Sequence, residues 1–208
     1  MTADLQRAKQ VVLDYCEALD AAGAEDVRDA LERHTAPGYR WRGVHPFHSQ
    51  LEASAVAEVF WTPTKRAFSS LQRRPDVFLA GDSGPTTGAG EGLQTEADGI
   101  WVCQMGHFLG LFDQPWLDIP ATGKMCFLRY AEFNRVAGDE IAEAALFVDV
   151  IGVMAHAGHY PLPPQTGASH VYPGPRTHDG LLLNGQDPAE GLVTVSYTHL
   201  TLPTTPYV

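Results

Sequence analysis

A few side chains in the second half of the chain have surroundings that suit acid–base chemistry. Asp149 is the only charged residue in the apolar run 144–155, and apolar surroundings raise the pKa of a carboxyl group. Asp149 also stands where a helix would begin, with Gly158 just past its expected end. Because Asp is a favoured N-cap and Gly a favoured residue after a helix, the sequence favours a capping role, with catalysis by Asp149 as the alternative.

Glu132 alternates with Tyr130 and Asn134 along a strand-like segment, so the three side chains share one face. If that face is buried, Glu132 is a general base of raised pKa, and Tyr130 donates a hydrogen bond to a carbonyl oxygen. If it is exposed, Glu132 and Arg129 are ordinary solvated or ion-paired residues. Periodicity alone does not choose between the two.

Histidines supply the remaining candidates. His107 lies in the middle of a strand-like segment, where a structural role competes with that of a catalytic partner. Two histidine pairs have the spacing of metal ligands, His45 with His48 and His156 with His159. No Cys or carboxylate pattern completes either site, so we expect no metal and no other cofactor.

The elements that must position these residues follow from the hydrophobic pattern. Helical spacing covers 5–22, 25–35 and 53–68, with a break expected before Pro63. Strand-like patterns cover 39–44, 76–81, 99–112, 124–136 and 140–148, and 83–99 is expected to be a loop or insertion. Gly138 and Asp139 make a tight turn, so the last two strands form an antiparallel hairpin. Helices first and antiparallel strands afterwards predict an α+β domain, with the helices on one face of a curved sheet.

Composition excludes some function classes. The chain has 208 residues with 14 Lys and Arg against 25 Asp and Glu, a net charge of -11, which disfavours nucleic acid as a partner. The apolar runs are too short to cross a bilayer, and the first residues lack the pattern of a signal peptide. We therefore expect a cytoplasmic protein without a membrane partner. The three cysteines lack metal or redox spacing and read as reduced core thiols.

Four motifs carry a resemblance to a known family. They are GHFLG (106–110), DIPATGK (118–124), FNRVAGDEIAE (133–143) and DVIGVMAHAG (149–158). Together they resemble SnoaL-like proteins of the nuclear transport factor 2-like superfamily, which include polyketide and ester cyclases. The resemblance implies a cone-shaped α+β fold, a deep cavity between sheet and helices, and a dimer packed through the sheet.

The resemblance also implies a site. The family's usual catalytic acid falls at Leu146, which cannot transfer a proton, and its histidine-type partner falls at Glu132. The candidate catalytic groups are therefore Glu132 or Asp149, with His107 and Tyr130 as their partners. The expected lining of the cavity is Trp41, His45, Phe60, Trp101 and Leu146.

The expected ligand is a small apolar, carbonyl-bearing molecule, and the expected chemistry is a cofactor-free cyclisation or isomerisation. Two alternatives stay open, a noncatalytic small-molecule binder and a dimerisation module.

We divide the chain into three parts. Residues 1–160 form the SnoaL-like domain, and the proline-rich residues 161–194 form an arm and linker, expected to lead to a missing second domain. The stretch VSYTHLTLPT in 195–208 resembles translated sequencing-adapter DNA. We therefore expect a truncated metagenomic reading frame, in which this tail is an artefact.

Overall fold

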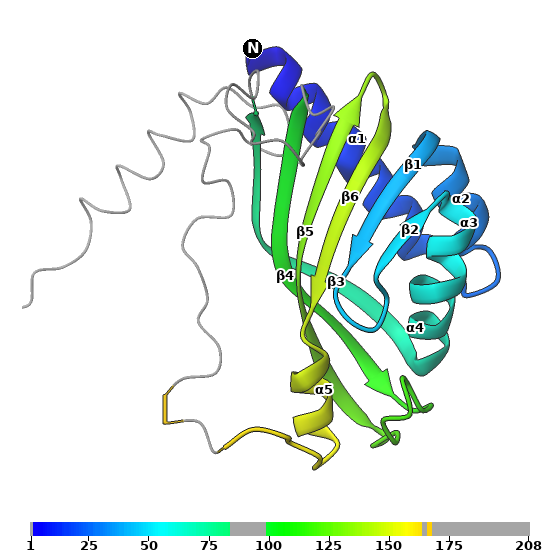
Figure 1. Cartoon of the computed structure of the whole chain (residues 1–208), viewed down its shortest axis with the longest axis vertical. Helices are drawn as coiled ribbons and strands as arrows, with labels where there is room; N and C mark the ends of the chain where they lie inside the picture. The colour runs from blue at the N-terminus through cyan, green and yellow to red at the C-terminus, as the bar shows by residue number, and fades with distance from the viewer. Residues whose placement is uncertain (1, 84–98, 164–165, 168–208) are drawn as a thin grey trace, which may run out of the picture.

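Helices pack against one face of a curved sheet in the computed structural model, which describes residues 2–83, 99–163 and 166–167 (Figure 1). The helical elements are α1 (Thr2–Ala21), α2 (Val27–His34), α3 (Ala53–Val56), the π-helical turn η1 (Ala57–Trp61), α4 (Thr62–Ala67) and α5 (Val150–His156). The strands are β1 (Thr35–Gly43), β2 (Ser49–Leu51), β3 (Phe68–Asp82), β4 (Ile100–Phe112), β5 (Lys124–Ala137) and β6 (Glu140–Val148). The loop expected at 83–99 falls almost wholly outside the described residues, as do most of the expected arm and the whole tail.

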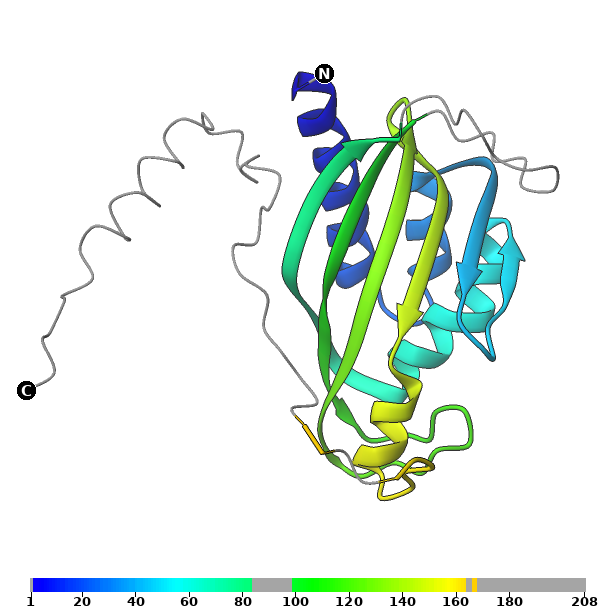
Figure 2. The same ribbon diagram turned by 60° about the vertical axis from the view of Figure 1, so that its left-hand side comes forward.

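The six strands lie in the order β2-β1-β6-β5-β4-β3. β1 and β6 run parallel, whereas every other neighbouring pair is antiparallel. α1 contacts β3, β4, β5 and β6, and Figure 2 shows α1 to α4 together behind the strands. The predicted α+β class, with helices on one face of a curved sheet, is confirmed. We name the helix-covered face concave and the opposite face convex.

Strand alternation decides which side chains reach the concave face. In β5 the buried positions are Cys126, Leu128, Tyr130, Glu132, Asn134 and Val136, and the residues between them are less buried. Glu132 pairs with Gln104 of β4 on one side and with Leu146 of β6 on the other. Since paired residues in a sheet share a face, one row of the concave face runs through these three residues.

α1 and α2 cover this face with apolar stripes at helical spacing. α1 buries Val12, Tyr15, Cys16 and Leu19, and α2 buries Val27, Ala30 and Leu31. Both stripes lie within the helical ranges that the sequence predicted, and the buried Tyr15 adds a hydroxyl to the interior. No helix among the described residues has the length and apolar character needed to span a bilayer.

The predicted helix break before Pro63 is wrong. The helix continues through η1, in which the N–H of Thr62 bonds to the carbonyl of Ala57 five residues back, and Pro63 follows in the first turn of α4. Proline is tolerated there because the π-helical turn directly before it changes the hydrogen-bond pattern where a proline N–H is missing. The wider turn aims Phe60 and Trp61 into the core, where both are buried.

The strand predicted at 76–81 is much longer, since β3 begins at Phe68 and runs through Pro75. Pro75 is accommodated because β3 is an edge strand and a register shift lies between Pro75 and Val77. A Cβ on Gly106, which pairs with Pro75, would lie 2.1 Å from the carbonyl oxygen of Arg74. Glycine at this position therefore permits the close approach of β3, which carries Arg73.

Candidate functional site

The concave face holds a cluster of buried polar side chains around Glu132, which has 0% of its surface exposed. One carboxylate oxygen, Oε2, accepts a hydrogen bond from Arg73 Nη1 at 2.9 Å and another from Gln104 Nε2 at 2.8 Å. The hydroxyl of Tyr130 donates to Gln104 Oε1 at 3.2 Å. Strands β3, β4 and β5 thus contribute to one hydrogen-bonded network.

Arg73 is the cation of this network. Its Nε lies 3.3 Å from the carboxylate of Asp20, near the end of α1, and its side chain is only 4% exposed. The guanidinium also lies over three aromatic rings, with centroids 5.6 Å away at Trp61, 4.9 Å at Phe108 and 5.4 Å at Tyr130. Such cation–π contacts are strongest where water is excluded. Two carboxylates and three rings therefore fix the guanidinium in place.

Burial sets the protonation of the cluster. It raises the pKa of Glu132 above its ordinary value, and the charge and hydrogen bond of Arg73 offset only part of that rise. Burial also raises the pKa of Tyr15, Tyr39 and Tyr130, so each phenol keeps its proton and can donate it in a hydrogen bond. The same cause raises the pKa of Cys16 to about 12, which leaves its thiol unsuited to nucleophilic work.

Several polar atoms of the concave face have no hydrogen-bond partner among the described residues. They are Glu132 Oε1, Arg73 Nη2, the hydroxyls of Tyr15 and Tyr39, and both amide atoms of Asn134. Buried polar groups in folded proteins nearly always have partners, and leaving one unpaired costs about 1–3 kcal/mol. These groups lie near one another, because contact with Asn134 lowers the pKa of Glu132 and contact with Tyr15 lowers the pKa of Tyr39, although no hydrogen bond of normal geometry forms. The arrangement is a base surrounded by donors.

His107 and Asp149 are not part of this cluster. His107 pairs with Arg129 in the register that puts it on the convex face, where its Nδ1 lies 3.7 Å from Asp76 and its ring packs on Phe127. Asp149 caps α5, accepting from the Gly152 N–H at 2.8 Å and from Arg129 Nε at 2.8 Å. The capping interpretation of Asp149 is confirmed.

Some of the residues expected to line a cavity lie on the face of the Glu132 cluster, and others lie outside it. Trp41, Phe60 and Leu146 are buried in the concave interior, and Leu146 is the direct neighbour of Glu132 on β6. Trp101 shares the convex face with Arg135, its partner in the sheet, and is half-buried. His45 is exposed beside β1, with its ring 5.3 Å from that of His48. The structure therefore places the first three residues on the same face as the Glu132 cluster, with Leu146 directly beside Glu132, and leaves the other two outside.

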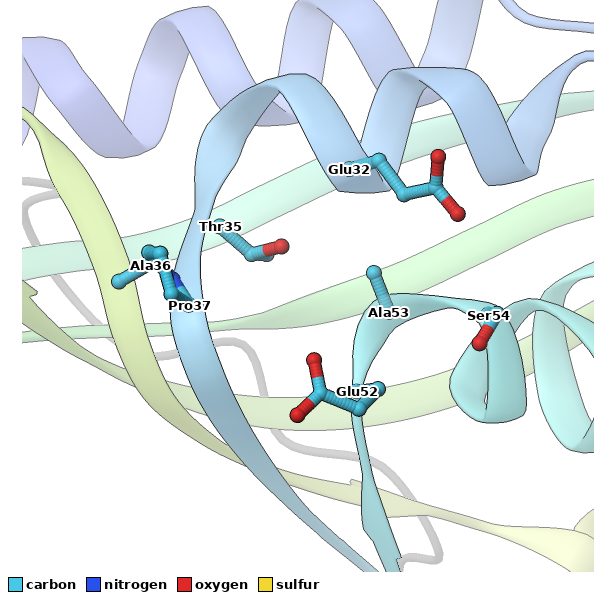
Figure 3. A pocket seen from close by; sticks show the side chains of 7 residues that line it. All are labelled: Glu32, Thr35, Ala36, Pro37, Glu52, Ala53 and Ser54. Atoms are coloured by element: carbon cyan, nitrogen blue, oxygen red, sulfur yellow. The ribbon is translucent and has the colours of Figure 1, made fainter.

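A separate pocket of about 340 Å³ lies between α2, β1 and the start of α3 (Figure 3). Its polar lining includes Glu32, Thr35, Glu52 and Ser54. Figure 3 shows the two glutamates approaching it from α2 and from the residue before α3. No residue of the Glu132 cluster lines this pocket, and its two carboxylates do not suit an apolar ligand. Among the described residues, no group of three His, Cys, Asp or Glu side chains is arranged to hold a metal ion.

Solved structures share this architecture. A proposed polyketide cyclase from Acidithiobacillus ferrooxidans matches with a TM-score of 0.51 at 15% identity, covering 74% of this chain and 96% of its own. AclR, a proposed hydroxylase from Streptomyces galilaeus, matches with a TM-score of 0.51 at 14% identity, covering 76% and 88%. The chain has the nuclear transport factor 2-like fold.

A proposed SnoaL-like polyketide cyclase from Jannaschia is also similar, with a TM-score of 0.49 at 20% identity, covering 76% of this chain and 94% of its own. The two structures that match with a TM-score of 0.51 confirm, as a likeness of fold, the resemblance carried by the four sequence motifs. The similar structures have different assigned activities, so the fold alone does not select a reaction. No protein-family model and no curated protein sequence matches the chain.

Sequence reasoning missed Arg73, the cation of the site. Arg73 stands in QRRPD, which looks like a polar connection before a strand. A signal was available for its neighbour Gln104, because residues three apart in a strand point to opposite faces. If Glu132 faces inward, that parity places either Gln104 or His107 beside it, and the structure selects Gln104.

Proposed function

We propose that the concave face binds a small, neutral, carbonyl-bearing molecule, and that Glu132 removes and returns a proton at the carbon next to the carbonyl. The observation that carries this proposal is the unpartnered Oε1 of Glu132, held inside an apolar interior while Oε2 is anchored by Arg73 and Gln104. Proton transfer of this kind underlies cyclisation by aldol closure and double-bond isomerisation, and it needs no cofactor.

The local charges favour a neutral ligand. Asp20 and Glu132 both contact the single guanidinium of Arg73, so an anionic ligand would meet two carboxylates. In the proposed step the C–H electron pair forms the enolate double bond, the carbonyl π pair moves to oxygen, and the proton goes to Glu132 Oε1. Negative charge thus moves from Glu132 to the ligand while the net charge of the cluster stays constant.

Proton exchange in a simple ketone tests the proposal. In D2O, the protein is expected to speed the exchange of the α-protons of 2-tetralone, measured by proton NMR. Glu132→Gln should lower this rate at least about 100-fold, because a positioned base contributes about 10²–10⁴. The matched control is Glu143→Gln, since Glu143 is also buried but is paired with Arg42 and Arg135. Equal exchange by both variants would refute the role of Glu132, whereas binding of 2-tetralone without exchange would support a noncatalytic binder.

We also propose that the convex face pairs two copies of the chain. Five large apolar side chains are exposed on its three central strands, Met105, Met125, Phe127, Phe133 and Phe147. Exposed apolar patches of this kind mark interaction sites. Arginines lie among these residues, at 129 and 135, and each is ion-paired with an acidic residue. Because the same face carries both signs of charge, it is suited to contact a second copy of itself.

Light scattering after size-exclusion chromatography tests the pairing. The wild-type chain is expected to have the mass of a dimer, and Phe127→Glu with Phe147→Glu is expected to give a monomer, because a charge buried without a partner opposes association. Leu51→Glu is the control, since Leu51 is 66% exposed but lies on the edge strand β2. A wild-type monomer, or a dimer that survives the double substitution, would contradict the proposal.

A further inference from the structure

One nitrogen of the Arg73 guanidinium, Nη2, takes part in none of the hydrogen bonds and ion pairs described above. Its Nε is placed against Asp20 and its Nη1 donates to Glu132 Oε2, whereas Nη2 is buried and has no hydrogen-bond partner among the described residues. A guanidinium is planar and always charged, so its donors have fixed directions once two of them are held. Nη2 is therefore an oriented, positively charged donor inside an apolar interior.

The free donor and the free base belong to the same ion pair. Arg73 Nη1 donates to Glu132 Oε2, so the two atoms without a hydrogen-bond partner, Nη2 and Oε1, belong to the two members of one salt bridge. A carbonyl compound with an α-hydrogen presents a matching pair, an oxygen that accepts and an adjacent C–H that gives up a proton. The ligand class that matches these two protein atoms is an enolisable ketone or aldehyde.

We infer that Arg73 Nη2 binds the carbonyl oxygen of the ligand and stabilises the negative charge that develops there when Glu132 takes the α-proton. This inference rests on the proposed function, because it assigns the second group of the same site. Charge-assisted donors that are fixed before the reaction stabilise an oxyanion without reorganisation. The aromatic rings of Trp61, Phe108 and Tyr130 keep the guanidinium in place during the charge transfer.

A stable analogue of the enol tests the role of Arg73 apart from catalysis. The probe is 2-naphthol, which has the shape of the enol of 2-tetralone and fluoresces differently as naphthol and as naphtholate. The wild-type protein is expected to bind it, and Arg73→Lys should weaken binding at least about 10-fold, because the ammonium group of lysine cannot reproduce the fork of the guanidinium. Arg135→Lys is the matched control on the convex face, where Arg135 faces Glu143.

The outcomes separate the two proposals. Binding that depends on Arg73, together with full exchange by Glu132→Gln, would leave Arg73 as the oxygen-binding group and remove Glu132 as the base. Absence of binding to the wild-type protein, or binding that Arg73→Lys leaves unchanged, would overturn the inference. If Arg73→Lys does not fold, a crystal of the wild-type protein with 2-naphthol decides, because the inference requires the naphthol oxygen at about 3 Å from Nη2.

Discussion

Arg73→Met is expected to lower the free energy of unfolding by about 3–5 kcal/mol, because it leaves the fully buried carboxylate of Glu132 without its cation. The double variant Arg73→Met with Glu132→Leu should recover most of that loss, since replacing both members of a buried pair by apolar groups is often neutral or stabilising. Urea denaturation of the single and double variants measures both effects. The matched control is Arg66→Met, which breaks the exposed pair with Glu25 and should cost less than about 1 kcal/mol.

The loss in Arg73→Met should also depend on pH. Without Arg73, its charge and hydrogen bond no longer lower the pKa of Glu132, so burial and the nearby carboxylate of Asp20 raise that pKa further than in the wild type, with Asn134 offsetting a smaller part. A carboxyl whose folded pKa exceeds its unfolded value binds more protons in the native state, so stability falls as pH rises above the unfolded value. The variant should therefore lose more stability than the wild type between pH 5 and pH 8. A pH-independent difference, or a double variant as unstable as the single one, would show that the pair is not the source of the effect.

Trp61→Ala is expected to lower the free energy of unfolding by about 3–5 kcal/mol, the usual cost of removing a large buried aromatic side chain. Trp61 is 1% exposed and packs edge-on against Phe60 and Phe108, with ring centroids at 5.0 and 5.8 Å. Its loss also removes one of the three rings around Arg73. The affinity for 2-naphthol should therefore fall together with the free energy of unfolding. Trp101→Ala is the control, because Trp101 is only half-buried on the convex face.

Denaturation and 2-naphthol titration of both tryptophan variants measure the two effects. A loss below about 1 kcal/mol for Trp61→Ala, or an equal loss for Trp101→Ala, would contradict the role of Trp61 as a packed core residue beside Arg73.

The sequence predicted the parts of the site that depend on local periodicity. Alternation placed Tyr130, Glu132 and Asn134 on one face, and all three are buried on that face. The turn at Gly138 and Asp139 joins the antiparallel strands β5 and β6 as predicted. Which face is buried depends on what packs against it, and α1 supplies that packing from the far end of the sequence.

The parts of the fold and of the site that the sequence did not predict depend on contacts between distant segments. Arg73 is buried only because Asp20, Glu132 and three aromatic rings from other elements meet around it, and no local pattern encodes such a meeting. The extension of β3 back to Phe68 was unpredictable for a related reason, since proline is tolerated there only at an edge strand with a register shift. The convex position of His107, in contrast, follows from strand parity once the register that pairs Gln104 with Glu132 is known.

The parallel pairing of β1 with β6 affects how the chain folds during its synthesis. Tyr39 and Trp41 belong to a strand whose partner in this pairing, Glu140–Val148, comes near the end of the domain. During synthesis this N-terminal strand must wait for a segment made much later, since parallel partners cannot be joined by a short hairpin. Until then, the backbone N–H and C=O groups on the β6 side of β1 have no strand partner. The nascent protein is therefore most exposed to wrong associations before β6 emerges.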